Sequence, residues 1–217
     1  MHRLYKLKKK KTMKRNLLTI AFILTSFTMM NCTNNQKQET PADTNQGNVV
    51  IDHIMTRTSV RAFTGQAVSK DTIEMLLRAG MAAPSAMNMQ PWHFVSITDR
   101  AVLDRLKEAN PHAKMLEQAP LAIVVCGDMT KALEGPGRDF WIQDCSAATE
   151  NILLAAHALG LGAVWTGGHP IEERANALRS ILNLPETMIP LCAIVIGYPA
   201  EKPEPKDKWK TENVTFL

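Results

Sequence analysis

The 217-residue sequence lacks the residue patterns that mark most hydrolases and metalloenzymes. It has four cysteines but no C-x-x-C pair, which argues against a thiol redox centre or a zinc knuckle. Its six histidines are scattered without the spacing of metal ligands. No serine lies in a G-x-S-x-G turn, and no pair of acids is spaced for hydrolysis. Metal, cysteine and serine chemistry are therefore not indicated.

Positive charge is concentrated at the N-terminal end of the chain. The sequence carries 25 Lys and Arg against 21 Asp and Glu, a formal net charge of +4. Residues 1–32 hold eight of these bases and no acid, which leaves 17 bases against 21 acids in the remainder, a net charge of −4. Since no nucleic-acid motif is present either, we expect no nucleic-acid partner.

The first 32 residues predict an export signal. A Lys-Arg pair precedes the apolar run 17–30, which is shorter than the roughly 20 apolar residues of a membrane-spanning helix. Cys32 and a polar stretch follow, a pattern that resembles a bacterial lipoprotein signal whose cysteine is acylated. We therefore expect an exported protein, membrane-anchored through a lipid on Cys32, at the periplasmic or cell-surface side. The alternatives are an ordinary secretory signal cleaved elsewhere, and translation from Met13 in place of Met1.

Residues 33–48 contain almost no apolar side chain and predict a flexible linker. Residues 49–217 suffice for one domain with a sizeable core, and no internal repeat is evident. Within this domain helical and extended patterns alternate. Helices are expected from Ser69 toward Pro84, after Asp99, over 138–159 and near 172–182, and strands over 93–98, 121–126, 163–166 and 191–196. The terminal segment 213–217 has strand character but no local partner.

Residues 84–92, Pro-Ser-Ala-Met-Asn-Met-Gln-Pro-Trp, predict a loop between a helix and a strand. The two prolines restrict its backbone, so little order has to be gained when a ligand binds. Ser85 and Asn88 offer hydrogen-bond donors and acceptors, and the small Ala86 lets main-chain groups approach a ligand. The loop therefore indicates a binding site for a flat ligand with polar edges. The alternative is an ordinary connection with Trp92 in the core.

A second motif, Arg57-Thr58-Ser59-Val60-Arg61, places two guanidinium groups four residues apart with a serine hydroxyl between them. Arginine makes forked, charge-assisted hydrogen bonds that match phosphate oxygens, so the motif predicts a phosphate site. In a helix or in a strand, the spacing would direct both arginines to one face. A solvated basic patch is the alternative for this motif alone. The two motifs together are more specific than either.

Together the motifs resemble those of the nitroreductase family of flavin-dependent oxidoreductases. The family's R-x-S-x-[RK] is similar to Arg57, Ser59 and Arg61, and its P-S-x-x-N-x-Q-P-W loop is similar to residues 84–92. The resemblance extends from about Val50 to the C-terminus and takes in segments 163–168 and 205–208 and Lys114. Two positions differ: Pro111 stands where some members carry asparagine, and Lys208 where they carry arginine.

The resemblance implies a site for flavin mononucleotide (FMN). In that site Arg57, Ser59, Arg61, Lys206 and Lys208 bind the phosphate, Ser85, Asn88 and Lys114 bond the polar rim of the ring, and Thr58, Pro84, Ala86, Gln90, Thr166, Gly167 and Gly168 complete the surface. A backbone amide near Gly167 or Gly168 is expected to face the hydride-accepting nitrogen. Positive charge beside the ring favours its reduced, anionic form.

The resemblance also implies the fold and the activity. The expected fold is α+β, a three-layer α/β/α nitroreductase-like arrangement with a central mixed sheet between helices. The C-terminal strand is exchanged in a homodimer, and each of two flavins contacts both chains. The implied activity is ping-pong hydride transfer from NAD(P)H through the flavin to a nitroaromatic, quinone or similarly electron-poor acceptor. The cofactor holds the reacting atoms, so no catalytic side chain is expected.

Two other functions remain open. One is reductive dehalogenation or flavin fragmentation on the same scaffold. The other is an exported lipoprotein that binds flavin or another aromatic anion without turnover. Export also leaves the electron donor open, because NAD(P)H is scarce outside the cytoplasm.

Overall fold

The computed structural model describes residues 44–217, which form one compact unit from Asn45 onward. The predicted signal, Cys32 and most of the predicted linker lie outside the described residues. Helix α2, Thr44–Thr56, starts before the domain boundary predicted at residue 49. The linker prediction is thus corrected over residues 44–48. Helix propagation adds one hydrogen bond for each residue fixed, so a helix established over the mostly apolar residues 49–55 extends into the polar stretch before it.

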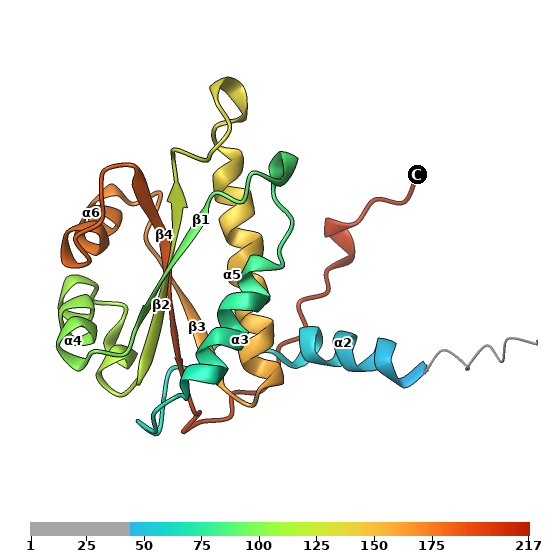
Figure 1. The fold of residues 1–217 in the computed structure, drawn as a ribbon. Coiled ribbons are helices and arrows are strands. Elements are labelled where there is room, and N and C mark those ends of the chain that lie inside the picture. Colours follow the sequence, from blue (N-terminus) through green and yellow to red (C-terminus); the bar gives the residue numbers. More distant parts are fainter. Residues whose placement is uncertain (1–43) are drawn as a thin grey trace, which may run out of the picture. The chain divides into compact units, whose positions relative to one another are not determined.

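Four strands form one sheet in the order β1-β2-β4-β3 (Figure 1). The strands are β1, Trp92–Ile97; β2, Leu121–Asp128; β3, Gly162–Gly167; and β4, Met188–Gly197. All three neighbouring pairs are antiparallel. The parallel pairing expected of a mixed sheet is limited, among the described residues, to an isolated bridge between Ser59 and Ala163 at the β3 edge.

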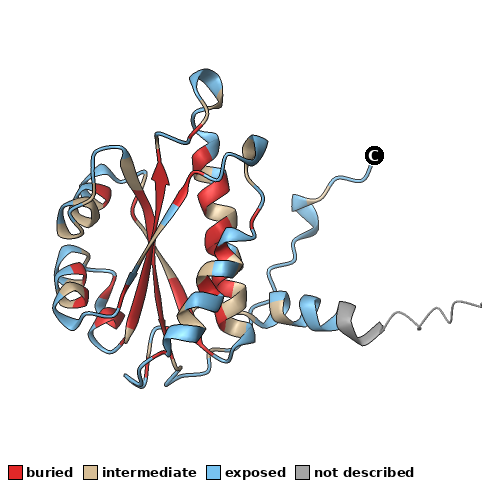
Figure 2. Cartoon of the chain, viewed as in Figure 1, coloured by how far each residue is buried: buried red, intermediate tan, exposed pale blue. Residues whose placement is uncertain are grey.

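Helices cover both faces of this sheet and give three layers (Figure 1). Helices α3, Lys70–Met81, and α5, Phe140–Ala158, pack on one face. Helices α4, Arg100–Ala109, and α6, Glu172–Ile181, pack on the other. Figure 2 shows the burial concentrated in the sheet and in the helix surfaces that face it. The expected three-layer arrangement is confirmed.

Strand β2 is buried along its whole length, as its unbroken apolar run predicted. Its side chains alternate between two cores because successive residues of a strand point to opposite faces. Leu121, Ile123 and Val125 lie in the core under α3 and α5, and Ala122, Val124 and Cys126 in the core under α4 and α6. Each strand residue thereby contributes to one of two separate cores.

Side-chain caps fix the starts of α3 and α4. The Ser69 hydroxyl accepts a hydrogen bond from the Thr72 amide at 3.2 Å, and Asp99 Oδ1 accepts one from the Val102 amide at 3.1 Å. Each cap satisfies one of the amides that the first helical turn leaves without a partner. Both caps were predicted. The remaining helices and strands that were predicted between residues 69 and 197 also lie close to their predicted ranges, with small shifts at their ends, whereas helix α2 was not predicted.

The three cysteines of the described chain, Cys126, Cys145 and Cys192, are buried and free. Burial raises the pKa of Cys126 and of Cys192 to about 12, and raises the pKa of Cys145 as well. The thiols therefore stay neutral at physiological pH and behave as small apolar side chains, as expected for cysteines in apolar strands and helices.

The C-terminal segment does not form a strand in the single chain. A short 3-10 helix, η4, covers Thr211–Asn213, and the last residues extend away from the sheet (Figure 1). Phe216 is 86% exposed. A strand needs a hydrogen-bonded neighbour, and none lies beside this segment among residues 44–217. Its exchange with another chain stays a prediction.

Among residues 44–217, no helix is both long enough and apolar enough to span a bilayer.

Candidate functional site

The arginine motif runs along the outer side of β3. Ser59 forms a parallel bridge to Ala163, and the Val60 amide donates a hydrogen bond to the Ala163 carbonyl at 3.1 Å. Arg57 turns toward α5, where its Nε lies 3.3 Å from Glu150 Oε1. Arg61 instead lines a cavity with residues of α6 and of the loop after α4. The predicted common face of the two arginines is therefore wrong for the single chain, because the segment is neither a helix nor a regular strand.

The chain after β4 returns to the arginine motif. Glu201 Oε1 accepts hydrogen bonds from the amides of Arg61 and Ala62, the latter at 3.1 Å. The Thr58 hydroxyl donates to the Pro203 carbonyl at 3.5 Å, close to the limit for a hydrogen bond. Lys206 and Lys208 follow in the same exposed segment. The structure thus places residues 201–203, which lead into the basic segment 205–208, beside the arginine motif.

A cavity of about 290 Å³, termed the Arg61 cavity, lies beside the carboxyl end of β3. Its polar lining comes from Arg61, Asn110, His112, Thr166, Gly167 and Arg174. None of the carboxylates among residues 44–217 lines it. Lys114, at the start of the 3-10 helix η2, Lys114–Glu117, is exposed and lies next to the lining residue Met115. The cavity is therefore electropositive and suited to an electron-rich or anionic group.

Gly167 lines the Arg61 cavity, and the neighbouring Gly168 has a different role. The Gly168 amide donates to the Leu191 carbonyl at 2.8 Å, so it is committed to β4. Successive residues of an antiparallel strand direct their amides to opposite sides, so the Gly167 amide faces away from β4. A Cβ added at Gly167 would meet nothing within 4 Å, whereas one at Gly168 would meet the Pro190 carbonyl oxygen at 2.8 Å. Gly167 is thus the residue that offers both an amide and open space.

The proline-bounded loop is held against α5. The Ala86 amide donates to Asp144 Oδ1 at 2.8 Å, the Gln90 amide donates to the Ser85 hydroxyl at 3.0 Å, and Gln90 Nε2 donates to Asn88 Oδ1 at 2.9 Å. The loop contains the 3-10 helix η1, Ala86–Asn88, and three residues with positive φ, namely Met87, Asn88 and Gln90. Non-glycine residues adopt such angles rarely, and they cluster at binding sites.

The loop and the Arg61 cavity remain separate in the single chain. None of residues 84–92 lines the cavity that contains Arg61, Thr166 and Gly167. Trp92 is buried at 8% exposure in the core under α3 and α5. The alternative interpretation of the loop, a connection that anchors Trp92, is therefore correct for that residue. It does not account for the constrained polar backbone from Ser85 to Gln90.

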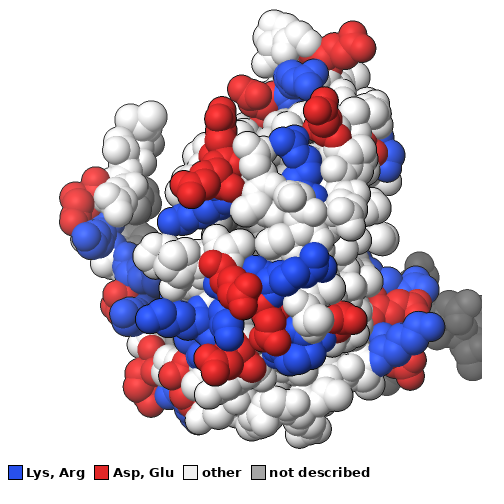
Figure 3. Space-filling view, turned by 90° about the vertical axis from the view of Figure 1, so that its left-hand side faces the viewer, with Lys and Arg blue, Asp and Glu red and all other residues white. Residues whose placement is uncertain are grey.

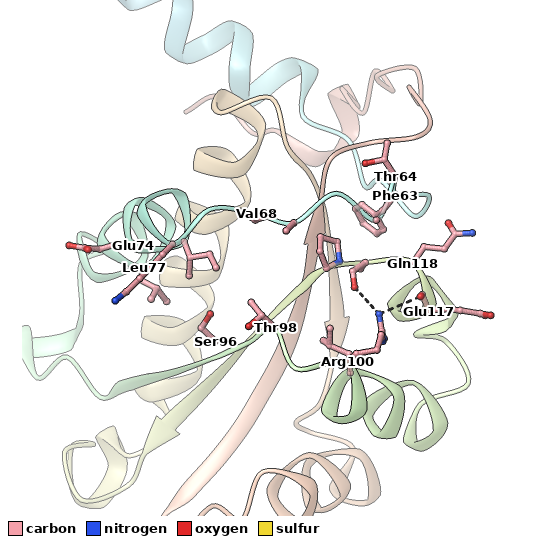
Figure 4. Close-up of a pocket in the computed structure, with 17 residues that line it drawn as sticks. Phe63, Thr64, Val68, Glu74, Leu77, Ser96, Thr98, Arg100, Glu117 and Gln118 are labelled. Atoms are coloured by element: carbon pink, nitrogen blue, oxygen red, sulfur yellow. Dashed lines mark hydrogen bonds between the residues drawn. The ribbon is translucent and has the colours of Figure 1, made fainter.

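A larger cavity of the described chain lies elsewhere. It measures about 1150 Å³ and runs beside the outer edge of β1 between α3 and α4, where Ser96 and Thr98 face it (Figure 4). We call it the β1 groove. Its guanidinium, Arg100, donates to the backbone carbonyls of Leu116 and Ala119, at 2.6 and 3.1 Å. None of the predicted site residues lines this groove. The predicted site residues therefore point to the Arg61 cavity as the candidate site, despite its smaller size.

The outer face formed by α4 and α6 carries mixed charge. Figure 3 shows Lys and Arg interspersed with Asp and Glu over that face. The net positive charge of the whole sequence therefore does not appear there as a continuous basic surface. The functionally relevant positive charge is local to the Arg61 cavity and its surroundings.

A comparison with protein families assigns this fold. The nitroreductase family model matches residues 54–113 and 107–198, which include the arginine motif, the proline-bounded loop and β3. This chain belongs to the nitroreductase family. The resemblance inferred from the motifs is thereby confirmed at the level of the family.

Individual relatives of this nitroreductase-family chain are similar to it in sequence and in structure. A Methanothermobacter thermautotrophicus protein with the provisional name NADH dehydrogenase/NAD(P)H nitroreductase is 44% identical over 166 residues, which cover 76% of this chain and 85% of the relative. A crystal structure of a similarly named Bacteroides thetaiotaomicron protein is 47% identical, with a TM-score of 0.74 over 78% of this chain and 98% of that chain. A Desulfovibrio desulfuricans protein, provisionally a nitroreductase and solved with FMN, is 32% identical, with a TM-score of 0.67 over 77% and 96%.

Three residues that lie at or beside the predicted site residues escaped the sequence analysis. Asp144 fixes the proline-bounded loop, and its only signal was an acid within the apolar stripe of a long helix. Asn110 lines the Arg61 cavity directly before Pro111, the position where the sequence departs from the family pattern. Arg174 reaches the same cavity from α6 and belongs to no motif. Tertiary packing alone brings these residues to the site.

Proposed function

We propose that this chain is an FMN-dependent NAD(P)H oxidoreductase. The observation that carries the proposal is the Arg61 cavity with the outward amide of Gly167. The residues present fit the cofactor: open space at Gly167 leaves room for a planar ring, and guanidinium groups with no carboxylate suit its electron-rich edge and its phosphate. The FMN complex of the Desulfovibrio relative, which shares the fold, supports the same cofactor.

Bound FMN would supply the acceptance and release of hydride, and the chain's residues would hold and tune it. Arg61 would bind the phosphate together with Ser59 and the lysines of the C-terminal segment, and Arg57 would join them by turning away from its ion pair with Glu150. The Gly167 amide would donate a hydrogen bond to the ring beside its reacting edge. One face of the ring must admit donor and acceptor in turn, so we propose ping-pong kinetics. The acceptor class that we propose is nitroaromatic, quinone or similarly electron-poor.

We further propose that the working form is a homodimer. Within one chain the proline-bounded loop does not line the Arg61 cavity, so a second copy would bring its own residues 84–92 to that site. The C-terminal tail supports this arrangement, since Trp209, Phe216 and Leu217 are 67%, 86% and 120% exposed. Strand β1 is an edge of the sheet and is bordered by the β1 groove. An unpaired edge beside a largely apolar groove is a site where a strand from the partner can add.

Export and acylation at Cys32 remain proposals that rest on the sequence. In this proposal residues 1–32 form a lipoprotein signal and the mature protein is anchored at the periplasmic or cell-surface side of the membrane. Metabolic labelling with a fatty-acid analogue should tag the wild type and not Cys32→Ala. Secretion of unlabelled wild-type protein would support the ordinary secretory signal instead.

The cofactor proposal is tested by reconstitution with FMN and by anaerobic addition of NADH or NADPH. We expect the wild type to bind FMN and its flavin absorbance to bleach. Arg57→Ala with Arg61→Ala should weaken FMN binding by about 100-fold or more in a folded protein, because each charge-assisted hydrogen bond contributes about 1.5–3 kcal/mol. Arg78→Ala with Arg179→Ala is the matched control, since Arg78 is exposed, Arg179 is half-buried and neither lines the Arg61 cavity.

Three results separate the alternatives. A wild type that takes up no FMN would refute the cofactor proposal. Bound flavin that neither nucleotide reduces would favour the non-catalytic binding lipoprotein or another electron donor. Undiminished FMN in the double Arg57 and Arg61 variant would contradict the phosphate assignment alone.

A further inference from the structure

The Arg61 cavity contains a guanidinium group that no sequence motif assigns. Arg174 lies in the first turn of α6 and lines both the Arg61 cavity and a narrower cavity beside Asn110 and Ala109. We propose that Arg174 is a cofactor-facing residue that stabilises the reduced form of the flavin and so sets its midpoint potential. This inference rests on the proposed function and deepens it.

The charge of Arg174 is not neutralised within the described chain. The ion pairs among residues 44–217 involve Arg57, Arg78, Arg100 and Lys131, and none includes Arg174. Glu172 and Glu173 precede it on α6, but adjacent helical positions do not face each other. No hydrogen bond of its side chain is found in this part of the chain either, in contrast to Arg179, which donates to Asn176. A guanidinium in a polar cavity without a partner is available for a ligand.

Separate elements supply the polar lining of the cavity. Arg61 comes from the segment that covers β3, Arg174 from α6 and His112 from the loop after α4. Gly167, with its outward amide, lines the same space. A ring that accepted a hydrogen bond from the Gly167 amide would therefore lie in the cavity that the guanidinium groups of Arg61 and Arg174 line. Pro111, in the same loop as His112, offers no side-chain donor.

Reduction adds negative charge to the ring, and a nearby cation favours the more negative state. Charges near a protein surface interact several times more strongly than in bulk water, so one guanidinium changes the ratio of affinities for reduced and oxidised flavin measurably. Arg174 would then bind both forms but the reduced form more tightly. Replacing Arg174 by a neutral residue should weaken the binding of reduced FMN more than the binding of oxidised FMN, and so lower the midpoint potential.

The test compares Arg174→Gln with Arg174→Lys and with Arg179→Gln, a neutralised arginine on the same helix outside the cavity. FMN affinity is measured by fluorescence titration and the midpoint potential by anaerobic dye equilibration. For Arg174→Gln we expect the ratio of affinities for reduced and oxidised FMN to fall about tenfold, a decrease of about 30 mV for a two-electron couple. Arg174→Lys should restore most of the potential, and Arg179→Gln should match the wild type.

Each result decides the inference. An unchanged potential in Arg174→Gln would overturn it. A higher KM confined to carboxylate-bearing acceptors, at unchanged potential, would also overturn it and would assign Arg174 to the acceptor. If Arg174→Gln holds no FMN while Arg179→Gln does, Arg174 belongs to the site, and a potential in Arg174→Lys equal to the wild type supports the charge effect. A wild type that binds no FMN would refute the proposed function itself. A wild type that binds FMN, with an unchanged potential in Arg174→Gln, would refute only the role of Arg174.

Discussion

The two edges of the sheet are completed in different ways. The β3 edge is covered within the chain, because residues 57–61 bridge to Ala163 and lead into the Arg61 cavity. The β1 edge has no strand beside it among residues 44–217 and borders the β1 groove of about 1150 Å³. One edge therefore carries positive charge and an open amide, and the other carries space and unpaired backbone.

The difference separates what one chain does from what requires two. The covered β3 edge provides one part of the proposed cofactor site, namely Gly167 in the strand itself and residues 57–61, which lie beside it. At the uncovered β1 edge, the guanidinium group of Arg100 is bonded to backbone carbonyls, so it is not free for a ligand. In the proposed dimer, the β1 edge holds the chains together while the β3 edge holds the cofactor. Variants at either edge test this division.

Removing the C-terminal tail tests the β1 edge and should have the largest effect. Deleting residues 211–217 keeps Lys206 and Lys208 but removes the exposed Phe216 and Leu217. Burial of one such side chain contributes about 1.5–3 kcal/mol, so we expect the dimer dissociation constant to rise by about 100-fold or more. Light scattering coupled to size exclusion measures this change. Thr215→Ala in the full chain is the control, and a truncated protein that dimerises as well as wild type would leave the β1 groove without its assigned occupant.

The adjacent glycines of β3 test the covered edge. Gly168→Ala should lower the free energy of unfolding by about 2–3 kcal/mol, because the added Cβ would lie 2.8 Å from the Pro190 carbonyl oxygen and the backbone must shift. Gly167→Ala should change stability by less than about 0.5 kcal/mol, since its Cβ meets nothing within 4 Å, but should weaken FMN binding by filling that space. Denaturant unfolding and FMN titration of both variants give the comparison. Equal FMN affinity of Gly167→Ala and wild type would remove Gly167 from the site.

Local signals made most of the fold predictable. The Ser69 and Asp99 caps depend on residues within one helical turn, and the unbroken apolar run of β2 consists of the six consecutive residues 121–126. Helix α2 was not predicted at all, because its first residues are polar and carry no local helix signal. The tail 213–217 has strand propensity, but propensity without a hydrogen-bonding neighbour forms no strand in one chain.

The site was predictable only in part, because local sequence signals do not describe contacts between residues that are distant in sequence. Sequence-adjacent residues such as Arg57, Ser59 and Arg61 form a recognisable motif. The directions of the two arginines depend on Glu150 and on the irregular backbone between them, which periodicity does not describe. Arg174 arrives at the cavity from a helix more than one hundred residues away in sequence. Residues that tertiary packing brings to a site leave no signal in their own neighbourhood.

Asp144 tests how the proline-bounded loop is prepared for the partner. Asp144→Ala leaves the Ala86 amide without its acceptor, and we expect a loss of about 1.5 kcal/mol in unfolding free energy, since hydrogen bonds to charged groups contribute about 1.5–3 kcal/mol and this one is partly exposed. FMN affinity should fall as well if the loop contributes to the site of the other chain. Asp144→Asn is the control because its amide oxygen still accepts the bond. Wild-type FMN affinity in Asp144→Ala would separate loop geometry from cofactor binding.

The smallest effect concerns the contact between α2 and α5, which positions the start of the arginine motif. His157 Nε2 lies 2.9 Å from the Thr56 hydroxyl, and its ring stacks edge-on against His53 with centroids 5.3 Å apart. Burial lowers the pKa of His157, and the nearby charges of His53 and Arg57 lower it further. Because the unfolded chain binds the proton more readily, the contact stabilises fully above about pH 6.5 and its contribution is lost as the pH falls toward the lower folded value.

Wild-type protein should therefore lose unfolding free energy relative to His157→Gln between about pH 6.5 and the lower folded pKa, by less than about 1 kcal/mol. Glutamine keeps a hydrogen-bonding group beside Thr56 but does not titrate there, so the difference between the two proteins isolates His157. Denaturant unfolding of both at pH 7.5 and at pH 5.5 measures it. A difference that does not change with pH would mean that His157 supports α2 by packing alone. The covering of the β3 edge would then not depend on proton binding at this contact.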